Sequence, residues 1–359
     1  PVSQFDPITQ KLLKYLPRTD DPQGNIITTG QNQINDAREY TLKADYYLSA
    51  TNRLSGRYFY DNFDRPGFNG NGDLAIAQRS GTARSDNVSV NEVWTIRPNM
   101  TNDFTLGYNR INSGALPAIV DSSGKPLSPS SLGADIPSPT QYPTVGLIAT
   151  NGFWISGVPV VQQRHNWIAN DTISINKGIH QIVAGVNIQT QYSFENATWG
   201  ADPLIWMTGG VTGNSFADFM LGDLTSYEQS GGEYNRLHGI NFASFVQDSI
   251  KLKPNLTINV GVRWEPQFAP RYEQDKLAVF SPGQQSTLFP NAPPGLVYAG
   301  DPGVPKGGWN PDWTAFGPRL SVAWQPKALP NTSFRTAFGM FEQPYDFSFY
   351  NHMGPNAPF

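Results

Sequence analysis

Two serine-containing patterns have the residue types that covalent catalysis would need. Ser122–Lys125 matches S-x-x-K and Ser85–Asn87 matches S-D-N, the pattern of an acyl-transferring serine nucleophile. The two occur in the reverse of the usual order, and no K-T-G follows them. Ser122 also precedes Gly-Lys-Pro instead of opening a helix. We therefore interpret both patterns as chance combinations of loop residues.

Cofactor and metal chemistry find equally little support. Gly70–Ala75 matches G-x-G-x-x-A, but a dinucleotide site needs a buried strand before it and a helix after it. This stretch lies in a Gly/Asn-rich surface loop. The chain has four histidines, His165, His180, His238 and His352. They are far apart without a ligand-like spacing, and no cysteine occurs, so we predict no metal centre, no cofactor and no enzyme.

Acidic side chains could act in pairs as general acid and base if the fold brought two of them together. The candidates are Glu195, Asp218, Asp248 and Glu265. Asp248 and Glu265 flank Lys253–Asn255, the centre of a predicted hairpin, at about equal distances from the turn. We favour a charge network that joins Asp248 and Glu265 to Arg263 and Arg319 over a catalytic pair.

Composition indicates the fold class that must hold any such site. Of 359 residues, 13% are aromatic and only 15% charged, with 34 Gly, 30 Pro and a net charge of −4. Aromatic residues suit strands while Gly and Pro break helices, so the mixture favours an all-β fold. No basic excess argues for a nucleic-acid partner. No apolar run reaches the ~18 residues of a membrane-spanning helix.

Period-two alternation over about ten residues, the length of a tilted membrane-spanning strand, is the organising signal. From Leu256 to Trp264 alternate side chains are apolar, while those between them, from Thr257 to Glu265, are small, polar or charged. We predict about twelve such strands, at 40–50, 53–62, 83–96, 101–112, 165–175, 179–194, 203–208, 224–231, 238–252, 256–265, 314–325 and 332–342. Two-faced strands fit a barrel between lipid and lumen, or a soluble sandwich with a core.

The connections between these strands favour the barrel. Tight turns are expected at Thr51-Asn52, Arg97–Asn99, Asn176–Gly178 and Lys253–Asn255. They alternate with long Gly/Pro/Ser/Asn-rich stretches at about 63–82, 113–164 and 266–313. Short periplasmic turns and long extracellular loops are typical of outer-membrane barrels. We therefore predict an antiparallel transmembrane β-barrel, present in part, whose lumen is lined by the polar faces.

The predicted barrel segment covers residues 40–342. Residues 1–39 are expected to form an extracellular loop with a short helix, and 343–359 the start of the next loop. Within the barrel, 197–237 fits only if the weak strand at 203–208 is real. The helix-like Phe216–Leu221 would then lie in a periplasmic turn.

Aromatic residues suggest two roles. Trp94, Tyr108, Trp264 and Trp324 come at or near strand ends, which predicts a membrane-interface girdle. The alternative for these four residues is a soluble core. A second group in or near long loops comprises Trp199, Trp206, Trp309 and Trp313. These rings could stack on a sugar or peptide ligand, or pack within their own loops.

Several strings resemble TonB-dependent receptors of the Oar-like type, common in acidobacteria and associated with a carboxypeptidase-regulatory-like domain. The strongest is Phe242–Glu265, which is similar to that family's barrel hairpin. Others, in the family's order, are Lys43–Tyr47, Asn52–Tyr58, Phe216–Gly222, Tyr298–Pro305, Phe316–Trp324 and Arg335–Phe341. Together the strings span most of residues 8–342.

The resemblance implies a receptor in the bacterial outer membrane that takes up an oligosaccharide, peptide or siderophore-like ligand. It implies contact with outer-membrane lipid and with the TonB complex, through a plug domain absent from this chain. Such transporters close with about 22 strands, so further strands of the parent barrel are expected as partners. A structural or adhesive surface barrel and a secreted soluble carbohydrate-binding β-protein are the alternatives.

Overall fold

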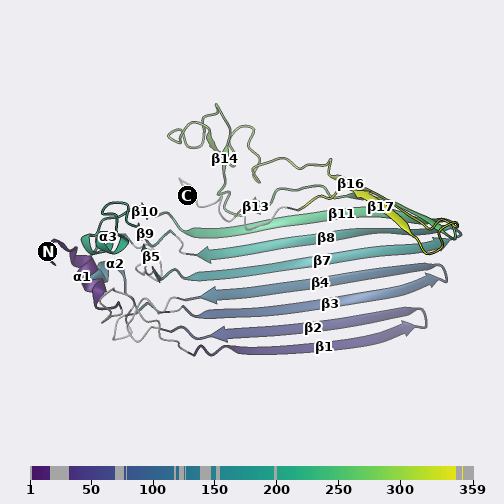
Figure 1. Ribbon diagram of the computed structural model, residues 1–359, viewed down its shortest axis with the longest axis horizontal. Coiled ribbons are helices and arrows are strands. Elements are labelled where there is room, and N and C mark those ends of the chain that lie inside the picture. Colours follow the sequence, from purple (N-terminus) through teal and green to yellow (C-terminus); the bar gives the residue numbers. More distant parts are fainter. Residues whose placement is uncertain are drawn as a thin grey trace.

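One long antiparallel sheet dominates this computed structural model (Figure 1). The structure describes residues 2–16, 32–68, 77, 79–116, 119–120, 125, 127–137, 147–150, 154–197, 200–344 and 350. Within them, ten strands pair in chain order: β1 (Asp36–Ser49), β2 (Asn52–Arg65), β3 (Gly81–Arg97), β4 (Met100–Ala115), β7 (Val160–Lys177), β8 (His180–Ala197), β11 (Glu233–Lys253), β12 (Leu256–Trp264), β16 (Phe316–Trp324) and β17 (Phe334–Gly339). The predicted all-β, antiparallel fold is confirmed, and the sheet closes only part of a barrel.

Register follows the alternation in the sequence. In β12, Val260 lies opposite Asp248 of β11 and Leu320 of β16, while Gly261 lies opposite Gln247 and Arg319. Partners across an antiparallel pair share a face of the sheet. The face that carries Leu256 to Trp264 is called the apolar face, and the face that carries Thr257 to Arg263 the polar face.

Connections differ in length at the two ends of the sheet, as predicted. At the turn end, β1–β2, β3–β4, β7–β8 and β11–β12 are joined by residues 50–51, 98–99, 178–179 and 254–255, and β16–β17 by 325–333. Gly178 has the left-handed φ of 61° that such a tight turn favours. At the loop end, residues 66–80, 116–159, 198–232 and 265–315 join the strands.

Two of the twelve predicted strands lie outside the main sheet. β9 (Leu204–Met207) and β10 (Ser226–Glu228) form a small sheet with β5 (Leu147–Thr150) and β6 (Trp154–Ser156). A strand of four residues is too short to cross a bilayer, which needs about 9–11. β9 is therefore part of the loop 198–232 and not of the barrel wall.

The helix at Phe216–Leu221 exists, but its predicted periplasmic position was wrong. α3 (Ser215–Leu221) lies between the end of β8 and the start of β11, at the loop end (Figure 1). Because neither β9 nor β10 crosses the wall, two predicted passages of the chain are lost and the helix between them lies at the loop end. Asn214 caps α3 by accepting from the backbone N–H groups of Phe216 and Ala217.

The loops at this end pack into a cap with its own apolar core. It includes α1 (Pro7–Leu13) and α2 (Pro129–Leu132) beside α3. Their shared buried cluster comprises Leu12, Ile119, Leu127, Leu132, Ile148, Ile155, Met207, Phe219 and Met220. None of the described helices is long and apolar enough to cross a membrane.

A second folded loop, residues 265–315, contains β13 (Arg271–Tyr272), β14 (Ala278–Phe280) and β15 (Leu296–Tyr298). β13 pairs with Leu237 and His238 of β11, above the point where β12 ends. The loop is organised around Asp301, which is 2% exposed. Its carboxylate accepts hydrogen bonds from Ser286, Thr287, Leu288 and Tyr298. A buried carboxylate is stable only when it is satisfied in this way.

Candidate functional site: the polar face of the barrel wall

The apolar face is the surface that meets lipid. Large apolar side chains stand exposed along it, among them Leu42, Val88, Leu106, Ile188, Val246, Val260, Leu320 and Phe338. A continuous exposed apolar surface of this extent is unfavourable in water and favourable in a bilayer. The polar face is therefore the lumen side and carries any ligand-binding groups.

All four predicted girdle aromatics lie on the apolar face, near its two ends. Trp94 and Trp324 are near the turn end, and both are more than 40% exposed. Tyr108 and Trp264 lie toward the loop end. Tyr108 packs on Trp167 at 4.8 Å between ring centroids. Two levels of rings on one face agree with two interfacial belts, although membrane contact at these rings remains a prediction.

The register corrects the place of Asp248 in the predicted charge network. Asp248 pairs with Val260 and Ile182, so it lies on the apolar face and not with Arg263. Its carboxylate meets His180 Nδ1 at 2.6 Å, and His180 lies at the turn end as expected. Distances from the hairpin turn were misleading because a β-bulge shifts the register between Ile250 and Lys253.

Asp248 is one of several carboxylates on the apolar face. Glu92 accepts a hydrogen bond from Asn52 at 2.7 Å, and Asp171 accepts one from Asn102 at 2.6 Å. Each of these partners lies on a neighbouring strand toward the turn end. Such bonds lower the cost of polar groups that face lipid.

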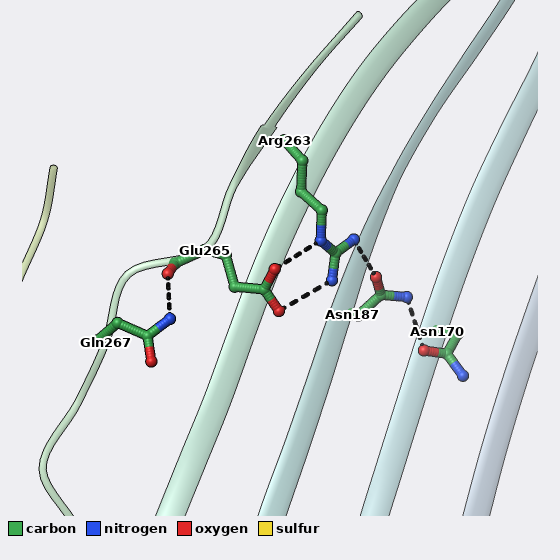
Figure 2. Close-up of polar contacts among 5 residues, drawn as sticks. All are labelled: Asn170, Asn187, Arg263, Glu265 and Gln267. Carbon is green, nitrogen blue, oxygen red and sulfur yellow. Dashed lines mark hydrogen bonds and ion pairs between the residues drawn. The ribbon is translucent and has the colours of Figure 1, made fainter. Parts of the chain in front are cut away.

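Arg263 and Glu265 form the ion pair that the sequence predicted. The guanidinium Nε and Nη2 of Arg263 lie 2.9 and 3.3 Å from the two carboxylate oxygens of Glu265. Nη1 donates to Asn187 Oδ1 at 2.9 Å, and Asn187 donates to Asn170 at 2.7 Å, as Figure 2 shows. A polar chain thus crosses from β12 over β11 to β8 and β7.

The strand between them leaves room for this crossing. β11 presents Ala243 opposite Asn187, and a side chain as small as alanine lets the guanidinium reach β8. Asn170 and Asn187 face each other directly in the β7–β8 register. Sequence reasoning missed both asparagines, although their equal distances from the tight turn at 178–179 predict this pairing.

Amide and hydroxyl side chains on neighbouring strands form further rows of hydrogen bonds, called polar rungs, across the same face. Asn259 accepts from Ser249 at 2.5 Å and donates to Ser321 at 2.8 Å. Asn91 donates to Thr105 at 2.9 Å and to Asp103 at 2.6 Å. Such a wall offers many neutral hydrogen-bond donors and acceptors.

Arg319 shares the polar face with Arg263 but does not join its ion pair. It lies opposite Gly261 of β12 and Gly339 of β17. Its guanidinium carbon lies 4.7 Å from the centre of the Phe341 ring, a cation–π distance. Of the four residues predicted to form one network, the structure joins Arg263 to Glu265 and separates Asp248 and Arg319.

At the loop end, the polar face is covered by chain that folds onto it. Leu237 is fully buried there beneath Tyr272, Leu277 and Tyr350. The Tyr272 hydroxyl donates to the backbone carbonyl of Tyr350. Burial raises the pKa of Tyr350 to about 12 and that of Tyr272 further, so both hydroxyls stay protonated at neutral pH. A neutral, well-packed cluster thus covers the polar face at the loop end of β11.

The loop aromatics predicted to contact ligand are not brought together. Trp206 of β9 packs against Val158 and Leu204 inside the cap. The ring of Trp313 stacks on the girdle residue Trp264, with centroids 6.1 Å apart. Trp309 lies beside Tyr350, and Trp199 lies outside the described residues. Self-packing within loops describes Trp206 best.

The remaining chemical candidates are also dispersed. Glu195 accepts from Gln162 on the polar face at 2.7 Å, while Asp218 accepts from the backbone of Thr212 in the cap at 2.8 Å. Ser85 lies on β3, whereas Ser122 and Gly70–Ala75 fall outside the described residues. In the described part of the chain, no three metal-ligating side chains cluster.

A two-faced antiparallel wall with turns at one end and long loops at the other defines a transmembrane β-barrel. The whole chain, residues 1–359, matches the family described as "Outer membrane beta barrel domain". The chain therefore belongs to this family and is a protein of the outer membrane. The secreted soluble alternative was wrong.

Similar solved structures are outer-membrane transporters. The copper transporter OprC is 7% identical with a TM-score of 0.48, covering 86% of this chain and 37% of its own. The outer membrane transporter YddB from Escherichia coli is 10% identical with a TM-score of 0.47, and the match covers 89% of this chain and 33% of YddB. The ferric-catecholate import receptor Fiu from E. coli K12, in its open form, is 13% identical with a TM-score of 0.45. That match covers 87% of this chain and 48% of Fiu. The chain thus spans a third to a half of their length. No curated protein matches it.

Proposed function

We propose that this chain is part of a TonB-dependent uptake receptor of the Oar-like type. The observation that supports this most directly is the β11–β12 hairpin. Residues 242–265, the string most similar to that receptor family, form the hairpin's two strands and carry the Arg263–Glu265 pair. An uptake receptor needs a polar wall beside the ligand and an apolar wall beside lipid, and this hairpin provides both.

In this function the chain binds and guides a ligand and carries out no covalent step. The loop cap and the loop 265–315 meet the ligand outside the cell, and the polar rungs line its path. Energy comes from the inner-membrane TonB complex through a plug domain contributed by the rest of the receptor. The ligand is an oligosaccharide, a peptide or a siderophore-like molecule, since each offers the hydroxyl and amide groups that the rungs can bind.

Two measurements on the full-length protein test this proposal. Purified receptor should bind the periplasmic domain of the TonB from the same bacterium. Deleting the receptor gene should abolish growth on a particular scarce nutrient from a panel of oligosaccharides, peptides and iron complexes. A tonB deletion should abolish growth on the same nutrient. A receptor that fails to bind TonB, with growth unchanged on every nutrient, would overturn the proposal.

A structural or adhesive surface protein is the second candidate. The cap, with a buried core of its own between α1, α2 and α3, favours it because a rigid surface module suits contact with other surfaces. In that case the gene deletion should impair adhesion or envelope integrity, and the tonB deletion should leave both unchanged.

A further inference from the structure

Arg319 lies near the middle of β16. Its cross-strand partners on the polar face are glycines, Gly261 on one side and Gly339 on the other. A glycine has no side chain with which to cover or bond its neighbour. Gln247 of β11 lies over Gly261 and the Phe341 ring lies over Gly339, so neither glycine position places a carboxylate beside the guanidinium.

Two hollows adjoin Arg319, and Gly261 on its β12 side lines both of them. One, of about 210 Å³, is lined by Arg319, Gly261, Gln247 and Arg263. The other, of about 480 Å³, is lined by Arg319 together with Asn259, Gly339 and Phe341 among others. Arg319 is common to both hollows and is the cation between them.

Arg319 differs from Arg263 in having no acidic partner. Arg263 is neutralised by both oxygens of Glu265 and bonded to Asn187. Among the described residues, no carboxylate or other acceptor forms a hydrogen bond with Arg319, whose guanidinium carbon lies 4.7 Å from the centre of the Phe341 ring. The Phe341 ring holds the side chain in place without satisfying its N–H donors, which remain available.

Charge on the surrounding wall has the same sign. On the polar face of β12, β16 and β17, the charged residues are Arg263, Arg319 and Arg335, and Glu265 follows directly after β12. By contrast, the polar face of β1 to β4 carries acidic Glu39, Asp45, Asp61 and Asp103 beside basic Lys43, Arg53, Arg57 and Arg65. The lumen wall is thus locally positive around Arg319, which attracts anions.

We propose that Arg319 is an anion-recognition point on the lumen wall and that the ligand carries a carboxylate. The planar guanidinium offers two parallel N–H groups that match the two oxygens of a carboxylate. The amides of Gln247 and Asn259, both on the β12 side of Arg319, supply neutral hydrogen bonds to the rest of the ligand. This inference rests on the proposed uptake function and narrows its ligand class to acidic molecules.

Binding to the purified full-length receptor in detergent tests this inference by isothermal titration. The probes are trigalacturonate and tri-glutamate, which carry carboxylates on a sugar and on a peptide. Their neutral methyl esters are the matched controls. Arg319→Gln should weaken binding of the acidic probe roughly tenfold to a hundredfold. Arg319→Lys should restore part of it, since lysine keeps the charge without the fork.

Arg335→Gln is the matched control variant, because Arg335 lies on the same face of β17 opposite Ala323, away from both hollows. It should leave affinity within about twofold. Preference for one acidic probe identifies the sugar or the peptide as the source of the carboxylate. The inference is overturned if neither acidic probe binds, if the esters bind equally well, or if Arg319→Gln has no effect. Since TonB binding is measured separately, a receptor that binds TonB but no acid would refute this inference alone.

Discussion

Replacing Asp301 by asparagine should open the loop 265–315 without unfolding the barrel. One carboxylate oxygen of Asp301 accepts from the Thr287 and Leu288 backbone N–H groups and the Thr287 hydroxyl, at 2.7 to 3.1 Å. The other accepts from the Ser286 hydroxyl at 2.7 Å and the Tyr298 N–H at 2.8 Å. An asparagine keeps an acceptor on one side only and turns an NH₂ group toward Tyr298 N–H.

The magnitude follows from these five bonds. Losing the bond from Tyr298 costs about 1.5–3 kcal/mol, because the acceptor is charged. The three bonds to the retained oxygen weaken by about 0.5–1 kcal/mol each when the charge is removed. The sum, about 3–6 kcal/mol, is comparable to the free energy that holds a local unit closed.

Hydrogen exchange of the full-length protein in detergent measures the effect directly. Amides at 284–301 should exchange faster by at least a hundredfold in Asp301→Asn, while those of β7 and β8 stay unchanged. Asp312→Asn is the control, since the Asp312 side chain is exposed and accepts hydrogen bonds from Thr314. Equal protection at 284–301 in Asp301→Asn and wild type would refute the reasoning.

The same site gives the loop a pH dependence. Burial alone would raise the pKa of Asp301, but the hydrogen bonds from Ser286, Tyr298, Thr287 and Leu288 outweigh burial and hold it below its ordinary value of 3.8. A lowered folded pKa contributes stability that is present above the unfolded pKa and lost as the pH falls below it. Protection of 284–301 should therefore be constant from neutral pH down to about pH 4 and decline in more acidic solution.

Three further substitutions test the assignment of faces and the packing between strands. Val260→Arg, at the middle of the apolar face of β12, should lower the free energy of unfolding in lipid vesicles by about 2–4 kcal/mol, whereas Thr257→Arg on the polar face should have little effect. Gly185→Ala should cost about 1–3 kcal/mol, because its Cβ would lie 2.7 Å from a backbone oxygen and 2.8 Å from the Phe245 ring. Gly56→Ala, with open space around it, should be neutral by the same unfolding assay. Glu265→Gln should lower stability by about 1–2 kcal/mol and leave the guanidinium of Arg263 without its acidic partner and bonded to Asn187, detectable as faster modification by phenylglyoxal.

The barrel strands could be predicted because each one carries its own two-faced pattern. In β12 five apolar residues alternate with small or polar ones, and the tight turn at 254–255 places β12 beside β11. The loop segments lack this independence. β9 resembles a weak barrel strand locally, and its small size shows only when its pairing with β5 and β10 is known.

The candidate site was predictable where it depends on one segment of sequence, and not where it depends on the pairing between strands. Arg263 and Glu265 are two residues apart on one strand, so their shared face and ion pair follow from the period of two. Asp248 is on another strand, and the bulge near Lys253 changes which residue it faces. The isolation of Arg319 depends on the glycines of two neighbouring strands, which no single segment of sequence reveals.

Three strands are longer than the bilayer requires, and this affects what a bacteriophage or an antibody contacts on the cell surface. β7 and β8 have 18 residues each and β11 has 21, whereas about 9–11 cross the membrane. The excess carries a hydrogen-bonded wall beyond the outer leaflet. A bacteriophage tail or an antibody that approaches from outside therefore meets a rigid sheet as well as loops. Epitopes on this wall depend on strand pairing, so antibodies raised against the folded protein should lose recognition after boiling.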